Sequence, residues 1–441
     1  MSTNQIVTLS SSVGPIIQTA TQSQVITHID VPEGFTTVSA SIVPIVNDNN
    51  FTQRYISSYV ENQTANSFDF VVNMNKNNLL VVDNAPLKFL GINTSIKIVN
   101  GNPAISYYDA TSMYLKYVRA LDVNGSLWNT PNIADNTGQA GAASSLAIVN
   151  GCPAISYYDQ VINKLKYVRA QDPNGNAWNA PFTFTDTNAV GMYTSLAVVN
   201  GFPAIAYYDY TNGSLKYVRS NDINGVVWNE FKVVDDNNNV GLGVTLKIVN
   251  GYPAISYYDA TNTRLKFVRA GDVNGSIWNK PIFVTNKTNI GSYSSLEIVN
   301  GNPAISYYDA TNKNLNFVRA TNNNGTQWGK PIVLDNSANV GLYNSLAIIS
   351  GVPAVSYVDY TVGSRNLKYI VATNANGTKW NNPVVIDTTN PSGYFNSLTD
   401  VNGHPGISYN DFFNGDLKFA YSDITPNFCQ DTQYNIQYTT E

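Results

Sequence analysis

The feature that most constrains this chain is a repeat with a period of 50 residues. The stretch NGNPAISYYDAT at 100–111 returns letter for letter at 300–311, and near copies stand at every interval of 50 between them. Weaker copies follow from Ser350 and from Asn402. A fixed period of this length indicates that one supersecondary unit is used repeatedly, here seven times.

Each unit contains four short segments with strand character, as the fifth copy illustrates. SLEIVNG at 295–301 ends in Asn-Gly, a strong hairpin signal, and NPAISYYD at 302–309 follows it. LNFVRA at 315–320 and WGKPIVLD at 328–335 come after turns that are rich in Asn. None of these segments has the length or the spacing of a helix, so the unit is predicted to be a four-stranded antiparallel meander.

A single meander has two faces to cover, so neighbouring units must pack against each other. Period and strand count favour a closed ring of blades, a β-propeller, over the alternative of an open solenoid. The last copy lacks its fourth strand, whereas LLVVD at Leu79–Asp83 stands alone before the first copy and resembles the fourth strand of other copies. We therefore predict an all-β, seven-bladed propeller in which Leu79–Asp83 supplies the outer strand of the last blade. This closure would remove the exposed sheet edges.

The turn before each Trp carries a second repeated motif, as in RALDVNGSLW at 119–128. It resembles the Asp-box (BNR) hairpin of sialidase-like propellers, with one extra residue between Asp and Gly. The matching residues are Asp122, Asp172, Asp222 and Asp272, then Gly125, Gly175, Gly225 and Gly275, then Trp128, Trp178, Trp228 and Trp278. Asn322 and Asn374 replace the Asp in two later copies. In that family the motif is a folding element away from the active site, so the resemblance implies a fold and not sialidase activity.

Four regions are predicted along the chain. Residues 1–24, rich in Ser, Thr and Gln, are expected to form a flexible tail. Residues 25–75 alternate apolar and polar positions and are predicted to form a small β module. Residues 79–422 form the propeller, and 423–441 a C-terminal extension. Because the module has too few residues for a sizeable core, we expect it to pair with copies of itself, as a homo-oligomer, or to dock onto a larger assembly.

Composition limits the partners. Only 12% of residues are charged and the net charge is −5, which argues against nucleic acid. No apolar run approaches the roughly 18–20 residues of a membrane span, and the first residues lack the features of a secretory signal peptide. The localisation is left open, with a virion or another surface assembly as the hypothesis.

A catalytic site is not expected. Arg and Asp recur in the same slots of most copies, which is typical of residues that hold blades together. A sialidase-like site needs three converging arginines, and only Arg54, Arg264 and Arg365 lie outside the repeated slot. Asp235 and Asp236, adjacent in what reads as a solvated turn, are poor candidates for paired-carboxylate chemistry. We expect no catalytic residues, no cofactor and no metal, with calcium binding at the DxNG turns as the lesser alternative.

A binding site is sought instead where the copies differ. Two residues after a Gly that all copies share, the chain places Asn93, Ala143, Tyr193, Gly243, Tyr293, Tyr343 and Phe395. Tyr193, Tyr293, Tyr343 and Phe395 are the candidate ligand-binding residues, because aromatic rings on the rim of the ring could stack on sugars or anchor a protein. The alternative is that they pack as a satellite core. The preferred function is a structural or attachment component that binds protein or glycan, followed by a lectin-like binder and a divergent glycosidase.

Overall fold

The computed structural model describes residues 6–7, 24–30, 36–41, 55–61, 67–74, 78–80, 94–185, 190–388, 392–411, 416–421 and 435–439. These residues form strands and turns, and none of them is helical. Accordingly, the described part of the chain has no helix that is long and apolar enough to cross a membrane. The chain divides into two compact units, Asn78–Pro426 and a unit that joins Met1–Asn77 to Asn427–Glu441.

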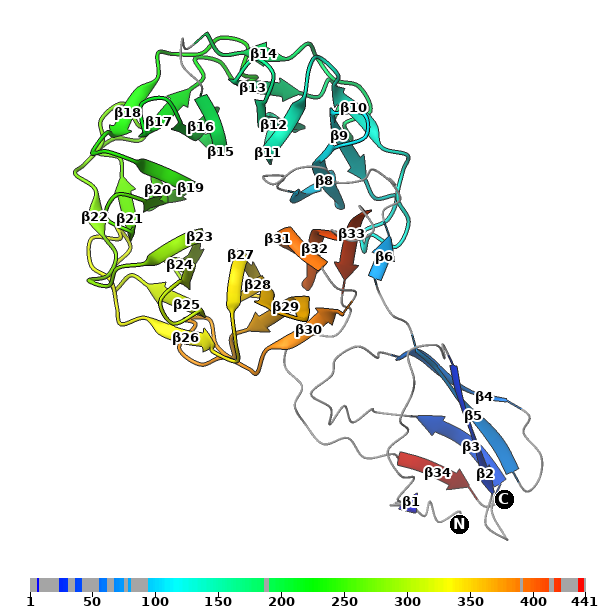
Figure 1. The fold of residues 1–441 in the computed structure, drawn as a ribbon. Coiled ribbons are helices and arrows are strands. Elements are labelled where there is room, and N and C mark those ends of the chain that lie inside the picture. Colours follow the sequence, from blue (N-terminus) through cyan, green and yellow to red (C-terminus); the bar gives the residue numbers. More distant parts are fainter. Residues whose placement is uncertain are drawn as a thin grey trace. The chain divides into compact units, whose positions relative to one another are not determined.

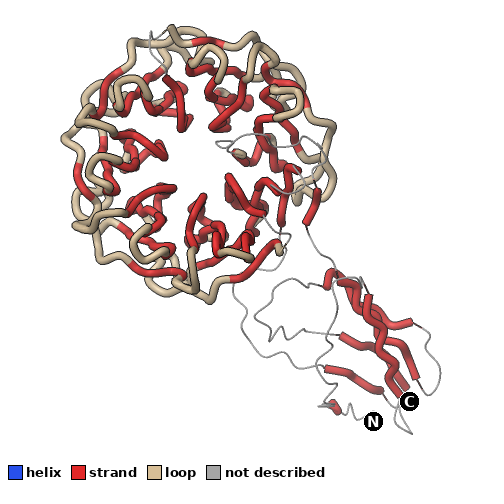
Figure 2. Tube along the Cα trace, viewed as in Figure 1, coloured by secondary structure: helices blue, strands red, loops and turns tan. Residues whose placement is uncertain are grey.

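The larger unit is a ring of seven four-stranded antiparallel sheets, which confirms the predicted seven-bladed propeller (Figure 1). In chain order, blades I to VI are β7–β10, β11–β14, β15–β18, β19–β22, β23–β26 and β27–β30, and blade VII is β31–β33 with β6. Strands converge on the ring axis, and loops lie mostly around the perimeter (Figure 2).

The first two strands of every blade form a hairpin that is closed by the repeated turn. The innermost strands are β7 (Ser95–Val99), β11 (Ala140–Val149), β15 (Val190–Val199), β19 (Val240–Val249), β23 (Ile290–Val299), β27 (Val340–Ile349) and β31 (Ser392–Val401). The second strands are β8 (Asn102–Asp109), β12 (Cys152–Asp159), β16 (Phe202–Asp209), β20 (Tyr252–Asp259), β24 (Asn302–Asp309), β28 (Val352–Thr361) and β32 (His404–Asp411). The turn residue Asn300 has a φ of +44° and Gly301 one of +80°, which explains why Asn-Gly recurs there.

The third and fourth strands complete each blade toward the perimeter. The third strands are β9 (Tyr114–Arg119), β13 (Lys164–Arg169), β17 (Ser214–Arg219), β21 (Arg264–Arg269), β25 (Asn314–Arg319), β29 (Ser364–Val371) and β33 (Asp416–Tyr421). The outer strands are β10 (Asn132–Asp135), β14 (Phe182–Thr183), β18 (Lys232–Asp235), β22 (Ile282–Phe283), β26 (Ile332–Asp335), β30 (Val384–Asp387) and β6 (Asn78–Leu80).

The ring is closed by a strand from the N-terminal side of the repeats. β6 pairs antiparallel with β33, with Leu79 opposite Phe419 and Leu80 opposite Lys418. The predicted closure by an N-terminal strand is thereby confirmed. The rest of the predicted strand, residues 81–83, lies outside the described residues.

The core lies between blades and repeats with them. Ile155 of blade II, fully buried, packs in one cluster with Leu115 and Tyr117 of blade I, and Ile255 packs in the same way against Leu215 of blade III. Burying an aliphatic side chain of this size stabilises the fold by about 1.5–3 kcal/mol. Each blade contributes side chains to two such clusters, one with each neighbouring blade. Both neighbours are therefore needed to bury the apolar side chains of a blade.

The Trp turns lock neighbouring blades at the perimeter. The six tryptophans each meet an aromatic ring on the third strand of the preceding blade edge-on, at centroid distances of 5.1–5.3 Å. Trp128 of blade I meets Phe419 of blade VII, so this contact also spans the closure. The turn glycine is needed there because a Cβ on Gly175 would lie 2.5 Å from Cε1 of Tyr117.

The acidic residue of the same turn organises its backbone. The carboxylate of Asp122 accepts hydrogen bonds from the backbone N–H groups of Asn124, Ser126 and Leu127 at 3.0, 3.1 and 2.7 Å. Burial alone would raise the pKa of Asp122, but these hydrogen bonds lower it below its ordinary value. Asn322 accepts the equivalent bonds from Asn324 and Thr326, so the Asn copies keep the turn without a charge.

The smaller unit contains two three-stranded sheets. One has the order β2 (Gln24–Asp30), β5 (Ser67–Met74), β4 (Tyr55–Glu61). The other has the order β1 (Ile6–Val7), β34 (Asn435–Thr439), β3 (Thr36–Ser41), so strands from both ends of the chain pair with each other. The sequence did not predict this participation of the C-terminal segment.

Candidate binding surface

The candidate aromatic residues all stand at one backbone irregularity. In blade III, Met192 pairs with Tyr208 and Ser195 with Ala206, so Tyr193 and Thr194 have no partner in the register. The same shift interrupts the innermost strands of blades II to VII. Such β-bulges aim a side chain out of the sheet. The bulged position holds Ala143, Tyr193, Gly243, Tyr293, Tyr343 and Phe395, and we call the four aromatic members the bulge aromatics.

The bulged residues adopt a left-handed backbone conformation. Tyr193, Tyr293, Tyr343 and Phe395 have φ values of +55°, +54°, +51° and +51°, and Gly243 has +61°. This conformation costs a residue with a Cβ about 1–2 kcal/mol, and such strain gathers at functional sites. The glycine two residues earlier is required by space, because a Cβ on Gly291 would lie 2.6 Å from Cβ of Leu265.

A belt of side chains fixes the bulges around the ring. The carbonyl oxygen of a bulged residue accepts a hydrogen bond from the next blade in the pairs Thr194–Ala143, Ser294–Gly243, Asn344–Tyr293, Asn396–Tyr343 and Thr94–Phe395. Thr94 precedes β7, so the last pair joins blade I to blade VII. The backbone at Tyr293, Tyr343 and Phe395 is therefore held by the next blade before any ligand arrives, whereas the position that would hold Tyr193 is Val244, which has no side-chain donor.

Three bulge aromatics form one continuous cluster. The ring centroids of Tyr293 and Tyr343 lie 4.6 Å apart, and those of Tyr343 and Phe395 lie 4.7 Å apart. Tyr394 adds a ring 5.4 Å from Tyr343, and Tyr360 one 6.1 Å from Tyr394. Burial, together with the neighbouring Tyr293, raises the pKa of Tyr343, so its hydroxyl stays protonated at neutral pH.

Tyr193 forms a second group in blade III, with Tyr208 at 6.5 Å and Tyr210 a further 6.3 Å from Tyr208. Between the two groups, blade IV presents only Gly243. Burial raises the pKa of Tyr193, and so does the interaction with Tyr293. Blade IV thus has no bulge side chain between the blades that carry Tyr193 and Tyr293.

The four candidate residues differ in exposure. Tyr193 and Tyr293 are 37% and 38% exposed, Tyr343 is partly buried, and Phe395 is only 8% exposed. Phe395 packs in a cluster with Tyr108 of blade I and with Tyr394. Phe395 therefore packs as part of a satellite core, which was the alternative to ligand binding. Tyr193 and Tyr293 instead have rings that a ligand can reach. Asn93, the equivalent position in blade I, lies outside the described residues.

Sequence reasoning missed three rings of this surface, namely Tyr210, Tyr360 and Tyr394. A signal for them existed: Tyr210 and Tyr360 follow the repeated Asp of their blades, where other copies have Ala110, Ala260 and Ala310. Applying the same search for variable positions to this slot would have found Tyr210 and Tyr360, but not Tyr394, which follows the shared Gly393.

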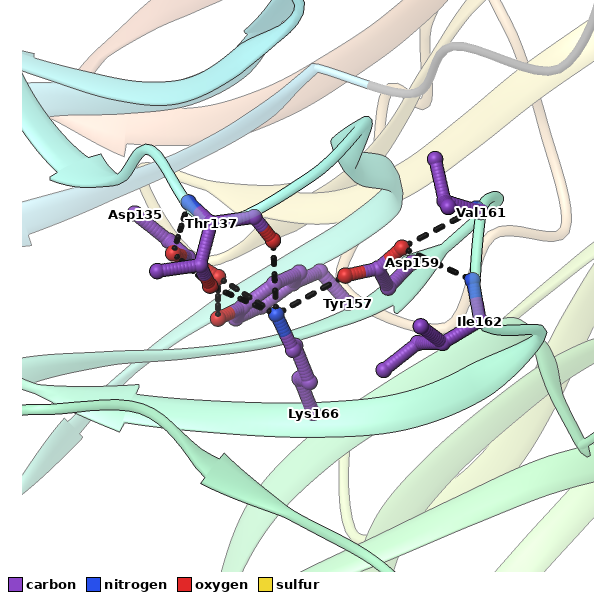
Figure 3. Close-up of polar contacts among 7 residues, drawn as sticks. All are labelled: Asp135, Thr137, Tyr157, Asp159, Val161, Ile162 and Lys166. Atoms are coloured by element: carbon purple, nitrogen blue, oxygen red, sulfur yellow. Dashed lines mark hydrogen bonds and ion pairs between the residues drawn. The ribbon is translucent and has the colours of Figure 1, made fainter.

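The repeated charges form buried clamps between blades (Figure 3). Asp135, at the end of blade I, accepts hydrogen bonds from the Tyr157 hydroxyl at 2.6 Å and from Nζ of Lys166 at 3.1 Å. Lys166 also pairs with Asp159 of its own blade at 2.8 Å. All three charged side chains are at most 4% exposed, so a substrate has no access to them.

Three further interfaces carry the same clamp, in the sets Asp235–Tyr257–Lys266, Asp335–Tyr357–Lys368 and Asp387–Tyr409–Lys418. The expectation that Asp235 lies in a solvated turn was therefore wrong, because the end of the outer strand meets the neighbouring blade. Burial would raise the pKa of Asp235, but the hydrogen bonds from Tyr257 and Lys266 lower it.

The repeated Arg slot also serves the scaffold. Nε of Arg119 donates to the carbonyl oxygen of Val99 at 2.8 Å, and Nη2 donates to that of Asn100 at 2.7 Å. Asp109 caps its own turn by accepting from the Thr111 N–H at 2.9 Å, and it pairs with Lys116 at 2.6 Å. Within the described residues, no group of three or more His, Cys, Asp or Glu side chains is arranged to hold a metal ion.

Comparisons with known proteins yield matches of structure alone. No family model matches the chain, and no curated protein matches it. A Hadza microbial sialidase, Hz136, is 13% identical with a TM-score of 0.44, covering 67% of this chain and 74% of its own. The NanB sialidase from Streptococcus pneumoniae is 12% identical with a TM-score of 0.42, covering 86% and 74%. YCF48 bound to D1 peptide is 13% identical with a TM-score of 0.46, covering 78% and 100%. Likeness at this level carries no argument about function.

Proposed function

We propose that this protein is a non-catalytic propeller that acts as a structural or attachment component and binds glycan through the bulge aromatics. The observation that carries the proposal is the left-handed conformation of Tyr193 and Tyr293, whose rings stay more than a third exposed. Each of these tyrosines thus keeps an accessible ring on a backbone conformation that costs a residue with a Cβ about 1–2 kcal/mol. Blade IV has Gly243 at the same position, where the conformation is free of this strain.

The chemistry of the surface suits a sugar. Aromatic faces stack on the apolar C–H faces of sugar rings, while tyrosine hydroxyls donate and accept hydrogen bonds with sugar hydroxyls. The raised pKa values of Tyr193 and Tyr343 keep both hydroxyls neutral, and so able to donate, over the physiological range. The belt holds the backbone of Tyr293 and Tyr343, which lowers the entropy cost of binding at these two residues.

We also propose that the acidic residues near the bulge aromatics are structural and not catalytic. At the end of the blades that carries the bulges, Asp209 pairs with Lys216 at 2.7 Å and caps its own turn. Asp335 is held by Tyr357 and Lys368. Carboxyl groups in these arrangements have depressed pKa values, which suits structural anions and not general acids.

The test is a glycan array probed with the wild type and with the Tyr193→Ala, Tyr293→Ala, Tyr343→Ala triple variant. We expect a defined set of glycans to bind the wild type, and the triple variant to lose it. The matched control is Val226→Ala, which changes a side chain that is 67% exposed in a Trp turn. Equal, featureless profiles for wild type and triple variant would refute glycan binding.

Attachment would use the smaller unit, which we propose joins the propeller to a larger assembly or to copies of itself. Its support is that β34 at the C-terminal end pairs with β1 and β3 from the N-terminal end, so both chain ends meet in one unit. Analytical ultracentrifugation of the full chain should show an oligomer or a stable complex with a partner. A monomer that keeps every partner after removal of this unit would contradict the assignment.

A further inference from the structure

The Asn-Gly turn that closes the first hairpin of a blade is a chemically reactive pair. The backbone nitrogen of Gly can attack Cγ of the preceding Asn, so that ammonia leaves and water opens the resulting succinimide. Nothing shields the glycine in these turns, since no atom lies within 4 Å of a Cβ built on Gly101 or on Gly403. Blade VI has Ser350 in this slot, and the other six blades carry an exposed Asn there, namely Asn100, Asn150, Asn200, Asn250, Asn300 and Asn402.

Five of these six asparagines are held by two hydrogen bonds. Nδ2 of Asn100 donates to Oδ1 of Asn174, in the Trp turn of the next blade, at 2.7 Å. The carbonyl oxygen of Asn100 accepts from Nη2 of Arg119 at 2.7 Å. Both bonds recur at Asn150, Asn200, Asn250 and Asn300. Cyclisation requires the carboxamide and the backbone to rotate toward each other, so both bonds oppose it.

Asn402 of blade VII lacks both restraints because the repeat departs from its pattern there. Tyr421 occupies the slot that holds Arg in blades I to V, and its hydroxyl donates to Oδ1 of Asn124 at 3.2 Å. Asn124 is the Trp-turn residue that would pair with Asn402 across the closure. Among the described residues, no side chain forms a hydrogen bond with the carboxamide or the carbonyl oxygen of Asn402. Its exposed side chain is therefore free to turn toward Gly403.

The same turn also activates the attacking nitrogen. The N–H of Gly403 donates to Oδ1 of Asp400 at 2.7 Å. In the other blades the residue equivalent to Asp400 is apolar, as Ile98 and Ile298 illustrate, because both pair with the repeated Pro as Asp400 does. A carboxylate at hydrogen-bond distance can accept the proton as the nitrogen attacks, which is general-base catalysis. Only the turn of blade VII thus combines an unheld Asn with a base beside its Gly.

We propose that Asn402 is a self-modification site, at which the chain converts its own Asn to aspartate or isoaspartate. The bond from the Gly403 nitrogen to Cγ of Asn402 forms, the Cγ–Nδ2 bond breaks, and the proton accepted by Asp400 passes to the leaving ammonia. A water molecule then opens the succinimide at either carbonyl. The turn follows the end of β31, whereas the bulge lies near its start, so the proposal does not depend on glycan binding.

The modification acts on the contact between blades VI and VII. Oδ2 of Asp400 accepts the N–H of Ser350, in the hairpin turn of blade VI, at 2.8 Å. Aspartate at position 402 places a second negative charge beside Asp400, and isoaspartate lengthens the backbone of a two-residue turn by one carbon. Both products disturb the bond between Asp400 and Ser350, so the interface weakens as the protein ages.

Peptide mapping by mass spectrometry, after incubation of the full chain in mildly alkaline buffer, measures the conversion of each Asn. Asn402 should convert at least about fivefold faster than each of the five held residues, because one net hydrogen bond corresponds to about fivefold in rate. Asp400→Asn should slow Asn402 by a similar factor and leave Asn100 unchanged. Asn174→Ala should accelerate Asn100 by a similar factor and leave Asn402 unchanged, since it removes the acceptor of the Asn100 carboxamide.

The consequence for stability is tested with Asn402→Ser, which gives blade VII the residue that blade VI has naturally. Ser350 has a φ of +48° and Asn402 one of +54°, so the turn accommodates the change. The melting temperature should fall during incubation for the wild type and stay constant for this variant, and an equal fall in both would refute the effect on the interface. The proposal is overturned if Asn402 converts no faster than the held residues, if Asn174→Ala leaves the rate at Asn100 unchanged, or if Asp400→Asn does not slow Asn402.

Discussion

The two ends of the blades use the same repeat in different ways. At the end with the Trp turns, the contacts are uniform: each Trp meets a ring of the preceding blade at 5.1–5.3 Å. At the end with the bulges, the backbone is just as uniform but the side chain varies from Gly243 to Tyr293. At the Trp-turn end the side chains pack between blades. At the bulge end the belt holds the backbone, and the side chain at the bulge is accessible for binding.

This difference predicts that substitutions at the Trp turns lower stability, whereas substitutions of the exposed bulge aromatics change binding. The blade interfaces offer a second, internal comparison. Four of them carry an Asp clamp, but Thr185 and Thr285 stand at the equivalent positions of blades II and IV. Blade interfaces therefore form without the clamp, and the clamp only adds to their stability.

The largest effect is expected at the Trp turn. Gly175→Ala should lower the free energy of unfolding by about 3 kcal/mol, because the new Cβ meets the Tyr117 ring and the residue has a φ of +78°. Gly201→Ala is the matched control, since its φ is +81° but nothing lies within 4 Å of the new Cβ. It should lose only about 1 kcal/mol. Denaturant unfolding followed by tryptophan fluorescence measures both, and equal losses would contradict the packing argument.

The next effect concerns the clamp. Asp235→Asn should lower the free energy of unfolding by about 2 kcal/mol at neutral pH, because Lys266 keeps Asp259 but Tyr257 loses a charged acceptor. Since the folded-state pKa of Asp235 is depressed, its contribution is present above the unfolded pKa of about 4 and is lost as the pH falls through the folded value. The difference between wild type and variant should therefore shrink below about pH 4. A difference that does not depend on pH would show that the carboxylate charge is not what stabilises the interface.

A smaller effect of opposite sign is expected at the bulge. Tyr193→Gly should leave the free energy of unfolding unchanged or raise it by up to about 1 kcal/mol, because relief of the left-handed strain offsets the lost contacts of a ring that is 37% exposed. Phe395→Gly is the contrast, since its ring is 8% exposed and packed against blade I, and it should lose stability. Thermal melting compares the two. A clear loss for Tyr193→Gly would make that ring part of the core.

The smallest effect is electrostatic. The pKa of Lys97, about 8 in the wild type, should fall further in Glu297→Gln, because the carboxylate is the one group that raises it. NMR titration of ¹³C-dimethylated lysines follows this shift residue by residue. An unchanged pKa would mean that Glu297 does not act on Lys97.

The fold could be predicted from the sequence because its determinants are local. Each determinant can be recognised from a few consecutive residues: the Asn-Gly turns, the Trp turn and the missing fourth strand of the last copy. Together they predicted seven blades and closure by an N-terminal strand. The location of Tyr193 and Tyr293 at the start of the innermost strand was predicted in the same way. Their left-handed conformation was not, because it depends on the register with the second strand.

The remaining features depend on contacts between blades. Asp235 and Lys266 are 31 residues apart and meet only when blades III and IV stack, so Asp235 read as part of a solvated turn. Phe395 is buried through a ring of blade I, which lies at the other end of the repeat. Lys247 and Glu297 are 50 residues apart and pair only because blades IV and V stack.

The most direct test measures stability and glycan binding on the same variant, Tyr193→Gly combined with Tyr293→Gly. These substitutions give blades III and V the residue that blade IV has naturally, so they remove the rings without disturbing the bulge backbone. The account predicts a protein that melts at or above the temperature of the wild type and has lost the glycans that the wild type binds on an array. A variant that is equally stable and keeps the full binding profile of the wild type would contradict it.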